Sequence, residues 1–184
     1  IHLSLDAMGG DYAPQIVIEG AAQSKIRYPN LKFSFFGNKD KIFPLVSSLE
    51  ILRNSSIIHT DEKIDANEKP SVAVRKGKNS SMGMAIQLVK SGEADAIVSA
   101  GNTGALFVIA KLNLNMIEEI DKPALSALWP NKNGMNIVLD LGANIECNEK
   151  NLVDFSLMGS ALHKSLFENE DPKVALLNIG SEEL

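Results

Sequence analysis

Short apolar runs alternate with longer segments of helical spacing along the first part of the chain. Four of the apolar runs, each predicted to form a strand, span residues 1–6, 31–36, 56–60 and 94–100, and the first of these strands is expected to be buried. Between them, apolar residues recur at the spacing of an amphipathic helix. This alternation predicts an α/β fold with a mostly parallel sheet.

Local start signals define several of the expected helices. Pro14 is expected at the first position of the helix that follows the first strand. Ser80 and Ser81 are expected to cap the helix after them, whereas residues 70–78 predict either a short helix or an extended arm. The polar segment 61–69 is expected to be a loop and the most mobile part of the chain. Further helices are expected from their apolar faces at residues 40–49, 103–117 and 148–167.

One segment breaks the alternation of strands and helices. Two strand-like runs, residues 124–129 and 135–141, flank a five-residue loop at 130–134, which predicts a β-hairpin and therefore a mixed sheet. A last strand is expected at residues 173–179. The chain stops directly after this strand and its loop. We therefore expect residues 1–184 to form one α/β domain, the amino-terminal portion of a longer protein.

Four of the expected strands end in a loop that is rich in Gly, Asn, Asp and Ser. These loops are residues 6–11, 99–104, 140–144 and 178–183. If the strands are parallel, all four loops lie on the edge of the sheet where open α/β folds bind ligands. Glycine lets backbone N–H groups approach a ligand closely, and an anion suits such a site.

The first loop does not match the common nucleotide-binding patterns. It lacks both the dinucleotide fingerprint and the Walker A sequence. What it contains is the pair Gly9 and Gly10 between two aspartates. Asp11 is expected either to cap the following helix or to bind a ligand. Asp6 is expected either to accept hydrogen bonds from neighbouring loops or to bind a ligand.

The second loop combines a flexible backbone with a helix start. Thr103 is expected to cap the helix, while Gly101 and Gly104 keep side chains away from an approaching ligand. Asn102 offers both a donor and an acceptor. A helix amino terminus with open N–H groups favours a phosphate or a developing oxyanion. An ordinary strand-to-helix turn would have a similar composition.

The third loop places Asp140 at a strand end and Asn144 shortly after it. A metal site would draw on the carboxylates of Asp6, Asp11, Asp140 and Glu146. No histidine lies near them in the sequence, and we expect no metal. Cys147, the single cysteine, has no evident activating neighbour and is not expected to be a nucleophile.

Charge adds one feature to this picture. Residues 75–78 (Arg-Lys-Gly-Lys) form the densest positive run and directly precede the helix with the serine caps. This run predicts either an anion or acidic-partner site or a solvated surface. The net charge of −5 gives no overall basic surface, so a nucleic-acid partner is not expected.

Taken together and in order, these stretches resemble the PlsX family of bacterial phosphate acyltransferases. The stretches are the four loops with the strands before them, Ala13-Pro14 after the first loop, and residues 75–82. The resemblance runs from residue 1 to residue 184. It implies a Rossmann-like three-layer α/β/α sandwich, related to phosphotransacetylases and to the isocitrate dehydrogenase type.

The resemblance also implies a reaction and its partners. Acyl-[acyl-carrier protein] and inorganic phosphate would give acyl phosphate for phospholipid synthesis, with no cofactor. It further implies a cytoplasmic homodimer and, as an option, peripheral association with the inner face of the cell membrane. The alternatives are a short-chain phosphotransacetylase acting on acyl-coenzyme A, a dehydrogenase of the related type, and a carrier-protein binding module without catalysis.

This chemistry needs an anion cradle more than a catalytic triad. A phosphate oxygen attacks a thioester, and a thiol with a pKa near ~8.5 leaves as a tolerable thiolate. We expect the aspartates to accept hydrogen bonds from loop N–H groups or to pair with a lysine, since unpaired carboxylates would repel phosphate. The predicted catalytic residues are Asn102, Asp140, Asn144 and Ser181. The predicted phosphate- and substrate-binding residues are Asp6, Gly9, Gly10, Asp11, Lys76, Lys78, Ser80, Gly101, Thr103, Gly104, Gly142 and Gly180.

Overall fold

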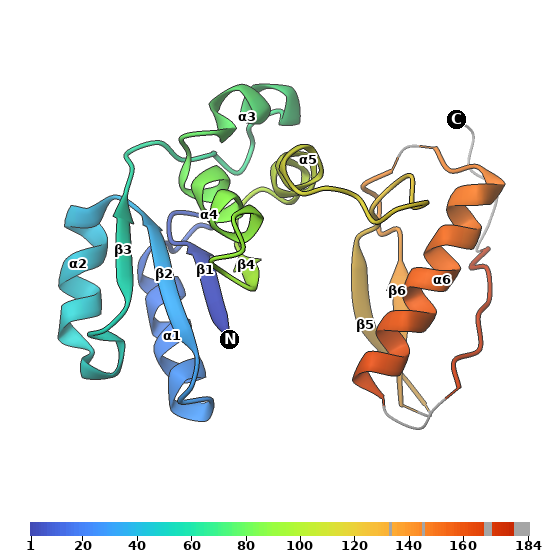
Figure 1. Ribbon diagram of the computed structural model, residues 1–184, viewed down its shortest axis with the longest axis horizontal. Coiled ribbons are helices and arrows are strands. Elements are labelled where there is room, and N and C mark those ends of the chain that lie inside the picture. Colours follow the sequence, from blue (N-terminus) through green and yellow to red (C-terminus); the bar gives the residue numbers. More distant parts are fainter. Residues whose placement is uncertain (133, 145, 168–170, 179–184) are drawn as a thin grey trace. The chain divides into compact units, whose positions relative to one another are not determined.

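A computed structural model describes residues 1–132, 134–144, 146–167 and 171–178 (Figure 1). The chain divides into two compact units, Ile1–Asn115 and Met116–Leu184, and each is described by itself. A single domain over residues 1–184 therefore stays a prediction. Within the described ranges, no helix is both long enough and apolar enough to span a membrane.

The first unit is built on a four-stranded parallel sheet, which confirms the predicted α/β class. Its strands are β1 (His2–Asp6), β2 (Lys32–Gly37), β3 (Ser56–His59) and β4 (Ala96–Val98), in the order β3-β2-β1-β4. The chain moves from β1 outward to β3 and then returns to the other side of β1. The strand order therefore reverses between β1 and β4, and open α/β sheets bind ligands at the carboxyl end of such a reversal.

Helices lie on both faces of this sheet. α1 (Gln15–Arg27), α2 (Lys39–Ser48) and the short 3₁₀ helix η1 (Glu50–Leu52) cover one face, and α4 (Ser81–Lys90) covers the other. α3 (Pro70–Gly77) and α5 (Thr103–Asn113) pack on α4 and on each other. Residues 70–78 predicted either a short helix or an extended arm, and the structure shows a helix over Pro70–Gly77. The segment 61–69 is a loop, as predicted.

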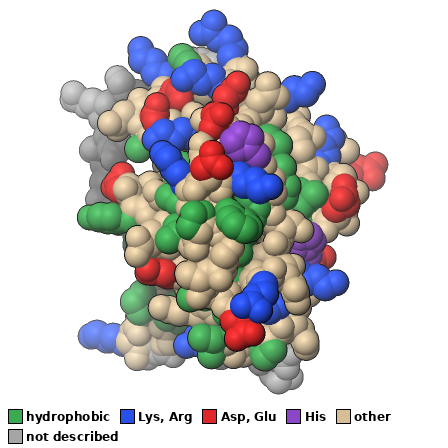
Figure 2. All heavy atoms as spheres, turned by 90° about the vertical axis from the view of Figure 1, so that its left-hand side faces the viewer, with side chains coloured by type: hydrophobic (Ala, Val, Ile, Leu, Met, Phe, Trp, Pro, Cys, Tyr) green, Lys and Arg blue, Asp and Glu red, His purple; other side chains and the backbone are tan. Residues whose placement is uncertain are grey.

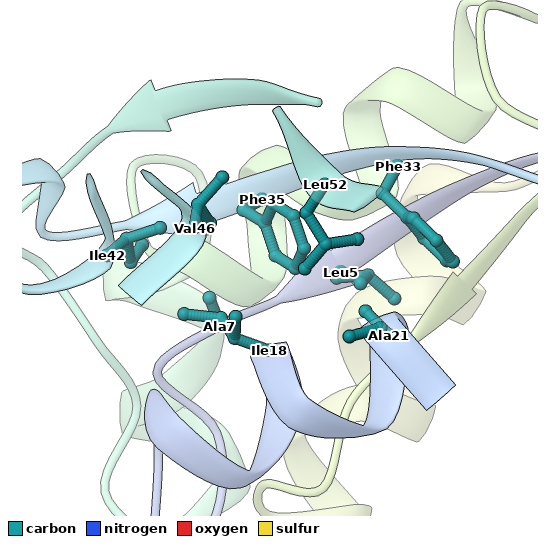
Figure 3. Packing of buried hydrophobic residues seen from close by; sticks show 10 residues of the cluster. Leu5, Ala7, Ile18, Ala21, Phe33, Phe35, Ile42, Val46 and Leu52 are labelled. Carbon is teal, nitrogen blue, oxygen red and sulfur yellow. The ribbon is translucent and has the colours of Figure 1, made fainter. Parts of the chain in front are cut away.

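Alternation along β1 explains the three layers. Leu5 packs with Ile18 of α1 and Phe35 of β2 in one buried cluster (Figure 3). Ser4 and Asp6 point to the opposite face, where both side chains hydrogen-bond to α4. Successive side chains of a strand point to opposite faces of a sheet, so β1 presents apolar side chains to α1 and polar ones to α4.

A shallow groove of about 640 Å³ lies between the amino-terminal parts of α1 and α2. Its lining includes Tyr12, Pro14, Ile16, Pro44 and Leu45. Figure 2 shows the face of this unit that carries α2, where hydrophobic side chains lie among charged ones. The groove thus belongs to the α1 and α2 side of the sheet, and the polar network described below belongs to the α4 side.

The second unit contains a β-hairpin and a long helix. β5 (Ser126–Asn131) pairs antiparallel with β6 (Gly134–Leu139), and α6 (Glu149–Leu166) packs on β6, with Gly159 against Leu139. Asn148 and Asn151 cap α6 reciprocally.

Three expectations about this unit need correction. The predicted five-residue hairpin loop is wrong, because the strands continue into it and Asn131 pairs with Gly134. The predicted mixed sheet is wrong in the described residues, where β5 and β6 pair only with each other. Residues 173–178 form no strand and are mostly exposed, and residue 179 lies outside the described residues.

Candidate functional site

The carboxylate of Asp6 is the centre of the candidate site. Asp6 is the last residue of β1, and its side chain is buried, with 2% of its surface exposed. Its Oδ1 accepts hydrogen bonds from the Ser81 hydroxyl at 2.6 Å and the Met8 N–H at 3.2 Å. Its Oδ2 accepts one from the Ser99 hydroxyl at 2.7 Å. Asp6 therefore accepts from its own loop, as expected, and is satisfied by protein donors.

The two glycine loops meet directly above this carboxylate. A Cβ atom added to Gly9 would lie 2.6 Å from Asp6 Oδ2, 2.8 Å from Ser99 Oγ and 2.9 Å from the Gly101 nitrogen. The Gly101 N–H donates to Ser99 Oγ at 3.1 Å. Gly10 has a φ of +100°, which favours glycine. Only glycine fits at residue 9, so the loops after β1 and β4 approach at backbone distance.

Asn102 caps α5 and also fastens a distant loop. Its Oδ1 accepts from the Ala105 N–H at 2.9 Å, so the predicted cap at Thr103 is wrong. Its Nδ2 donates to the carbonyl oxygens of Ala66 at 2.8 Å and Glu68 at 2.9 Å. Thr103 is exposed in the first turn of the helix. Both ends of the Asn102 amide are thus engaged with the protein.

The loop that Asn102 holds is segment 61–69, called the strap below. Its Ile64 is buried in a cluster with Met82 and Ile86 of α4. The Glu62 carbonyl accepts from the Ser81 N–H at 2.9 Å. The charges of the strap suggested a mobile loop, but this apolar anchor and these hydrogen bonds attach it to α4 and α5.

The basic run on α3 is partly neutralised by the strap. Lys76 Nζ lies 2.6 Å from Glu68 Oε1, and the Glu68 side chain is only 9% exposed. The hydrogen bond from Lys76 lowers the pKa of Glu68, and the bond to Glu68 raises the pKa of Lys76. Lys78 is exposed. Ser80 is buried as the cap of α4 and accepts from the Gly83 N–H at 3.1 Å.

The loop after β6, in the second unit, is braced from within. Asp140 has a φ of +63° and accepts from Asn144 Nδ2 at 3.0 Å and Cys147 Sγ at 3.2 Å. Asn144 Nδ2 also donates to the Pro123 carbonyl at 3.1 Å. Burial, followed by the hydrogen bond to Asp140, raises the pKa of the Cys147 thiol. The thiol is therefore held in its protonated, less nucleophilic form.

The structure brings some of the predicted site residues together. Asp6, Gly9, Gly10 and Gly101 gather at the carboxyl ends of β1 and β4, and Asn102, Thr103 and Gly104 follow at the start of α5. Asp140, Gly142 and Asn144 share one loop of the other unit. Gly180 and Ser181 lie outside the described residues. Among the described residues, no three His, Cys, Asp or Glu side chains are arranged to hold a metal ion.

Sequence reasoning misjudged Asp11 and missed two serines. Asp11 is exposed, and Pro14 occupies the cap position of α1, so the cap interpretation of Asp11 is wrong. The sequence predicts a cap at Ser81 and assigns no role to Ser99. The signal for Ser81 was the pair of adjacent serines, because Ser80 alone caps α4 and a second buried hydroxyl needs another partner.

The fold and these contacts define an open α/β protein in which two glycine loops meet at the carboxyl edge of the sheet, where its strand order reverses. The sequence model of the family described as "Fatty acid synthesis protein" matches residues 1–184. The chain belongs to this family, the PlsX family that its loops resemble.

Similar proteins carry a consistent name. A protein of Pelagibacter ubique (strain HTCC1062) named phosphate acyltransferase is 53% identical over 184 residues, 100% of this chain and 55% of that protein. A phosphate acyltransferase of Rhizobium rhizogenes (strain K84 / ATCC BAA-868) is 47% identical over 186 residues, 100% of this chain and 53% of that protein. The chain thus spans about half the length of the curated relatives it matches.

Proposed function

We propose that the protein transfers a fatty acyl group from acyl-[acyl-carrier protein] to inorganic phosphate, giving acyl phosphate for phospholipid synthesis. The observation that carries this proposal is the identity of 53% across the whole chain to a relative named phosphate acyltransferase. The contact between the loops of Gly9 and Gly101 supports it, because two flexible backbones meet where an anion would bind.

The reaction makes few demands on side-chain acids and bases. A phosphate oxygen attacks the thioester carbon, the carbonyl oxygen becomes an oxyanion, and the C–S bond then breaks to release the thiolate. A phosphate dianion near neutral pH is already a nucleophile, and a thiol of pKa ~8.5 is a tolerable leaving group. Cys147, held protonated, is not needed as a nucleophile.

The residues we assign to this reaction mostly act through the backbone. The N–H groups of Thr103 and Gly104 lie in the first turn of α5 and have no acceptor within the helix, so they can donate to a phosphate or an oxyanion. Asn102 would serve this site by holding the strap and the start of α5. Asp140, Asn144 and Ser181 remain proposed members of the catalytic group.

The carrier protein is proposed to dock near α3. Carrier proteins are acidic, and Arg75 and Lys78 are exposed there while Lys76 is paired with Glu68. Replacing Arg75 and Lys78 by Gln should raise KM for the carrier-bound substrate and leave a small thioester unaffected. An equal effect on both substrates would count against docking at α3.

A cytoplasmic homodimer with peripheral membrane association is also proposed, on family resemblance alone. Sedimentation of the complete protein that carries this sequence, with and without anionic vesicles, tests the homodimer and the membrane association.

The proposed reaction is tested by measuring thiol release and acyl phosphate in the complete protein that carries this sequence. We expect both products from long-chain acyl carrier protein only when phosphate is present. Faster turnover of acetyl-coenzyme A would favour a short-chain phosphotransacetylase. Carrier binding without phosphate-dependent thiol release would favour a binding module and contradict the proposal.

A further inference from the structure

We propose that Ser81 and Ser99 are positioning residues: through the carboxylate of Asp6 they hold the glycine loops that form the proposed phosphate site. This inference rests on the proposed function, in which the glycine loops bind phosphate. It concerns two residues that lie outside the predicted site.

The Asp6 network joins three segments that are distant in the sequence. Ser81 at the start of α4 and Ser99 after β4 both donate to this one carboxylate, at 2.6 and 2.7 Å. Met8 donates to it from the first glycine loop at 3.2 Å. Hydrogen bonds to a charged acceptor are stronger than neutral ones, so the buried carboxylate holds both glycine loops against α4.

Ser99 transmits this anchoring to the second glycine loop. Its hydroxyl donates to Asp6 Oδ2 and accepts from the Gly101 N–H at 3.1 Å. A hydroxyl that donates to a carboxylate becomes a better acceptor, so the two bonds reinforce each other. The peptide before Gly101 is thereby oriented, and Gly101 leads directly into the first turn of α5. Loss of the Ser99 hydroxyl should therefore disturb the N–H groups of Thr103 and Gly104.

Ser81 anchors the same carboxylate from the other side. Its side chain is 1% exposed, and its hydroxyl donates to Asp6 Oδ1. Helix capping does not account for it, because Ser80 already caps α4. Its N–H also donates to Glu62, so Ser81 links Asp6 to the strap.

The test compares Ser99→Ala and Ser81→Ala with Ser99→Thr, which keeps a hydroxyl, and with Ser48→Ala, an exposed serine of α2. In the complete protein, we expect Ser99→Ala and Ser81→Ala to raise the phosphate KM about tenfold and to change the thioester KM by less than about twofold. Ser99→Thr should restore most of the phosphate KM, and Ser48→Ala should match the wild type. Hydrogen exchange of the Gly101 amide should become faster in Ser99→Ala.

The possible outcomes separate the two proposals. If the wild type forms no acyl phosphate, the proposed function fails and this inference fails with it. If the wild type is active and both KM values are unchanged in Ser99→Ala, the inference alone is overturned, even where kcat falls with the amount of folded protein. If Ser81→Ala does not fold, the half-buried Ser99 still decides between these results.

Discussion

Two aspartates with the same local setting, Asp6 and Asp140, play different structural parts. Each lies at or just after the end of a strand and before a glycine, and each was predicted to belong to the site. Asp6 is buried, and two of its donors, Ser81 and Ser99, come from distant segments. Asp140 is half-buried and takes hydrogen bonds from Asn144 and Cys147, close to it in the sequence. The same short pattern thus gives a long-range anchor in one unit and a local brace in the other.

The largest expected difference in the free energy of unfolding comes from making the same substitution, Asp to Asn, at both aspartates. Asp6→Asn should lower the free energy of unfolding of Ile1–Asn115 by about 3 kcal/mol, because buried hydroxyl and N–H donors lose a charged acceptor. Asp140→Asn should cost the second unit about 1 kcal/mol or less. Hydrogen exchange in β1 and β4 follows the first unit, and fluorescence of Trp129, the single tryptophan, follows the second. Equal losses at the two positions would contradict the comparison.

A smaller difference is expected for two glycines. Gly9→Ala should destabilise the first unit by about 2–3 kcal/mol, because the new Cβ would overlap Asp6, Ser99 and Gly101. Gly142 has a φ of +91°, but the position of its Cβ is open, so Gly142→Ala should cost only about 1 kcal/mol. Urea unfolding with the same two probes measures both. A cost for Gly9→Ala no greater than that for Gly142→Ala would show that the loops can separate without loss.

The sequence predicted what depends on local pattern. Periodicity located the four parallel strands, and the glycines identified the sheet edge where Gly9 and Gly101 meet. The adjacent serines 80 and 81 indicated that Ser81 has a partner, but no local pattern indicated that Asp6 joins Ser81 and Ser99, because both reach it only through the fold. The apolar run at residues 173–178 suggested a strand, but a strand also needs a neighbour for its hydrogen bonds, which periodicity does not reveal.

Turn composition misled the prediction of the hairpin. Pro130, Asn131 and Gly134 are typical turn residues, yet all three belong to the paired strands. Proline is tolerated in edge strands, where its missing N–H faces no partner. The predicted cap of α5 was wrong by one residue for a similar reason. Asn102 and Thr103 are both good caps, and only the backbone conformation decides between them.

Two asparagines extend the comparison. Asn102→Ala removes the cap of α5 and the bonds to the strap, and should cost about 2 kcal/mol. Asn144→Ala removes the bonds to Asp140 and Pro123 and should cost about 1 kcal/mol. Trypsin should cleave faster after Lys63, inside the strap, in Asn102→Ala and at the wild-type rate in Asn144→Ala. Cleavage at equal rates in both variants would mean that the other contacts of the strap, at Glu62, Ile64 and Glu68, hold it without Asn102.

The smallest expected effect concerns two ion pairs of nearly equal exposure. Glu68 (9% exposed) pairs with Lys76, and Asp154 (8%) pairs with Lys150, each lysine being 51% exposed. Hydrogen bonds to these carboxylates raise the pKa of both lysines. The stability that each lysine adds to its unit should therefore be fully present below pH 10.5, the ordinary lysine pKa. It should be lost as pH rises through the higher pKa of the folded state.

Acid should break the pair of Glu68 and Lys76 only at low pH, because the hydrogen bond from Lys76 lowers the pKa of Glu68 below 4.5. The contribution of Glu68 is complete above pH 4.5 and is lost as pH falls through its folded pKa. Carbon-13 NMR of the Glu68 carboxyl measures this titration directly. Lys76→Met should raise the pKa of Glu68, while the matched Lys150→Met should leave the pKa of Glu68 unchanged. A Glu68 that titrates at 4.5 or above in the intact protein would mean that Lys76 is free in solution, available for the phosphate or carrier role first predicted for it.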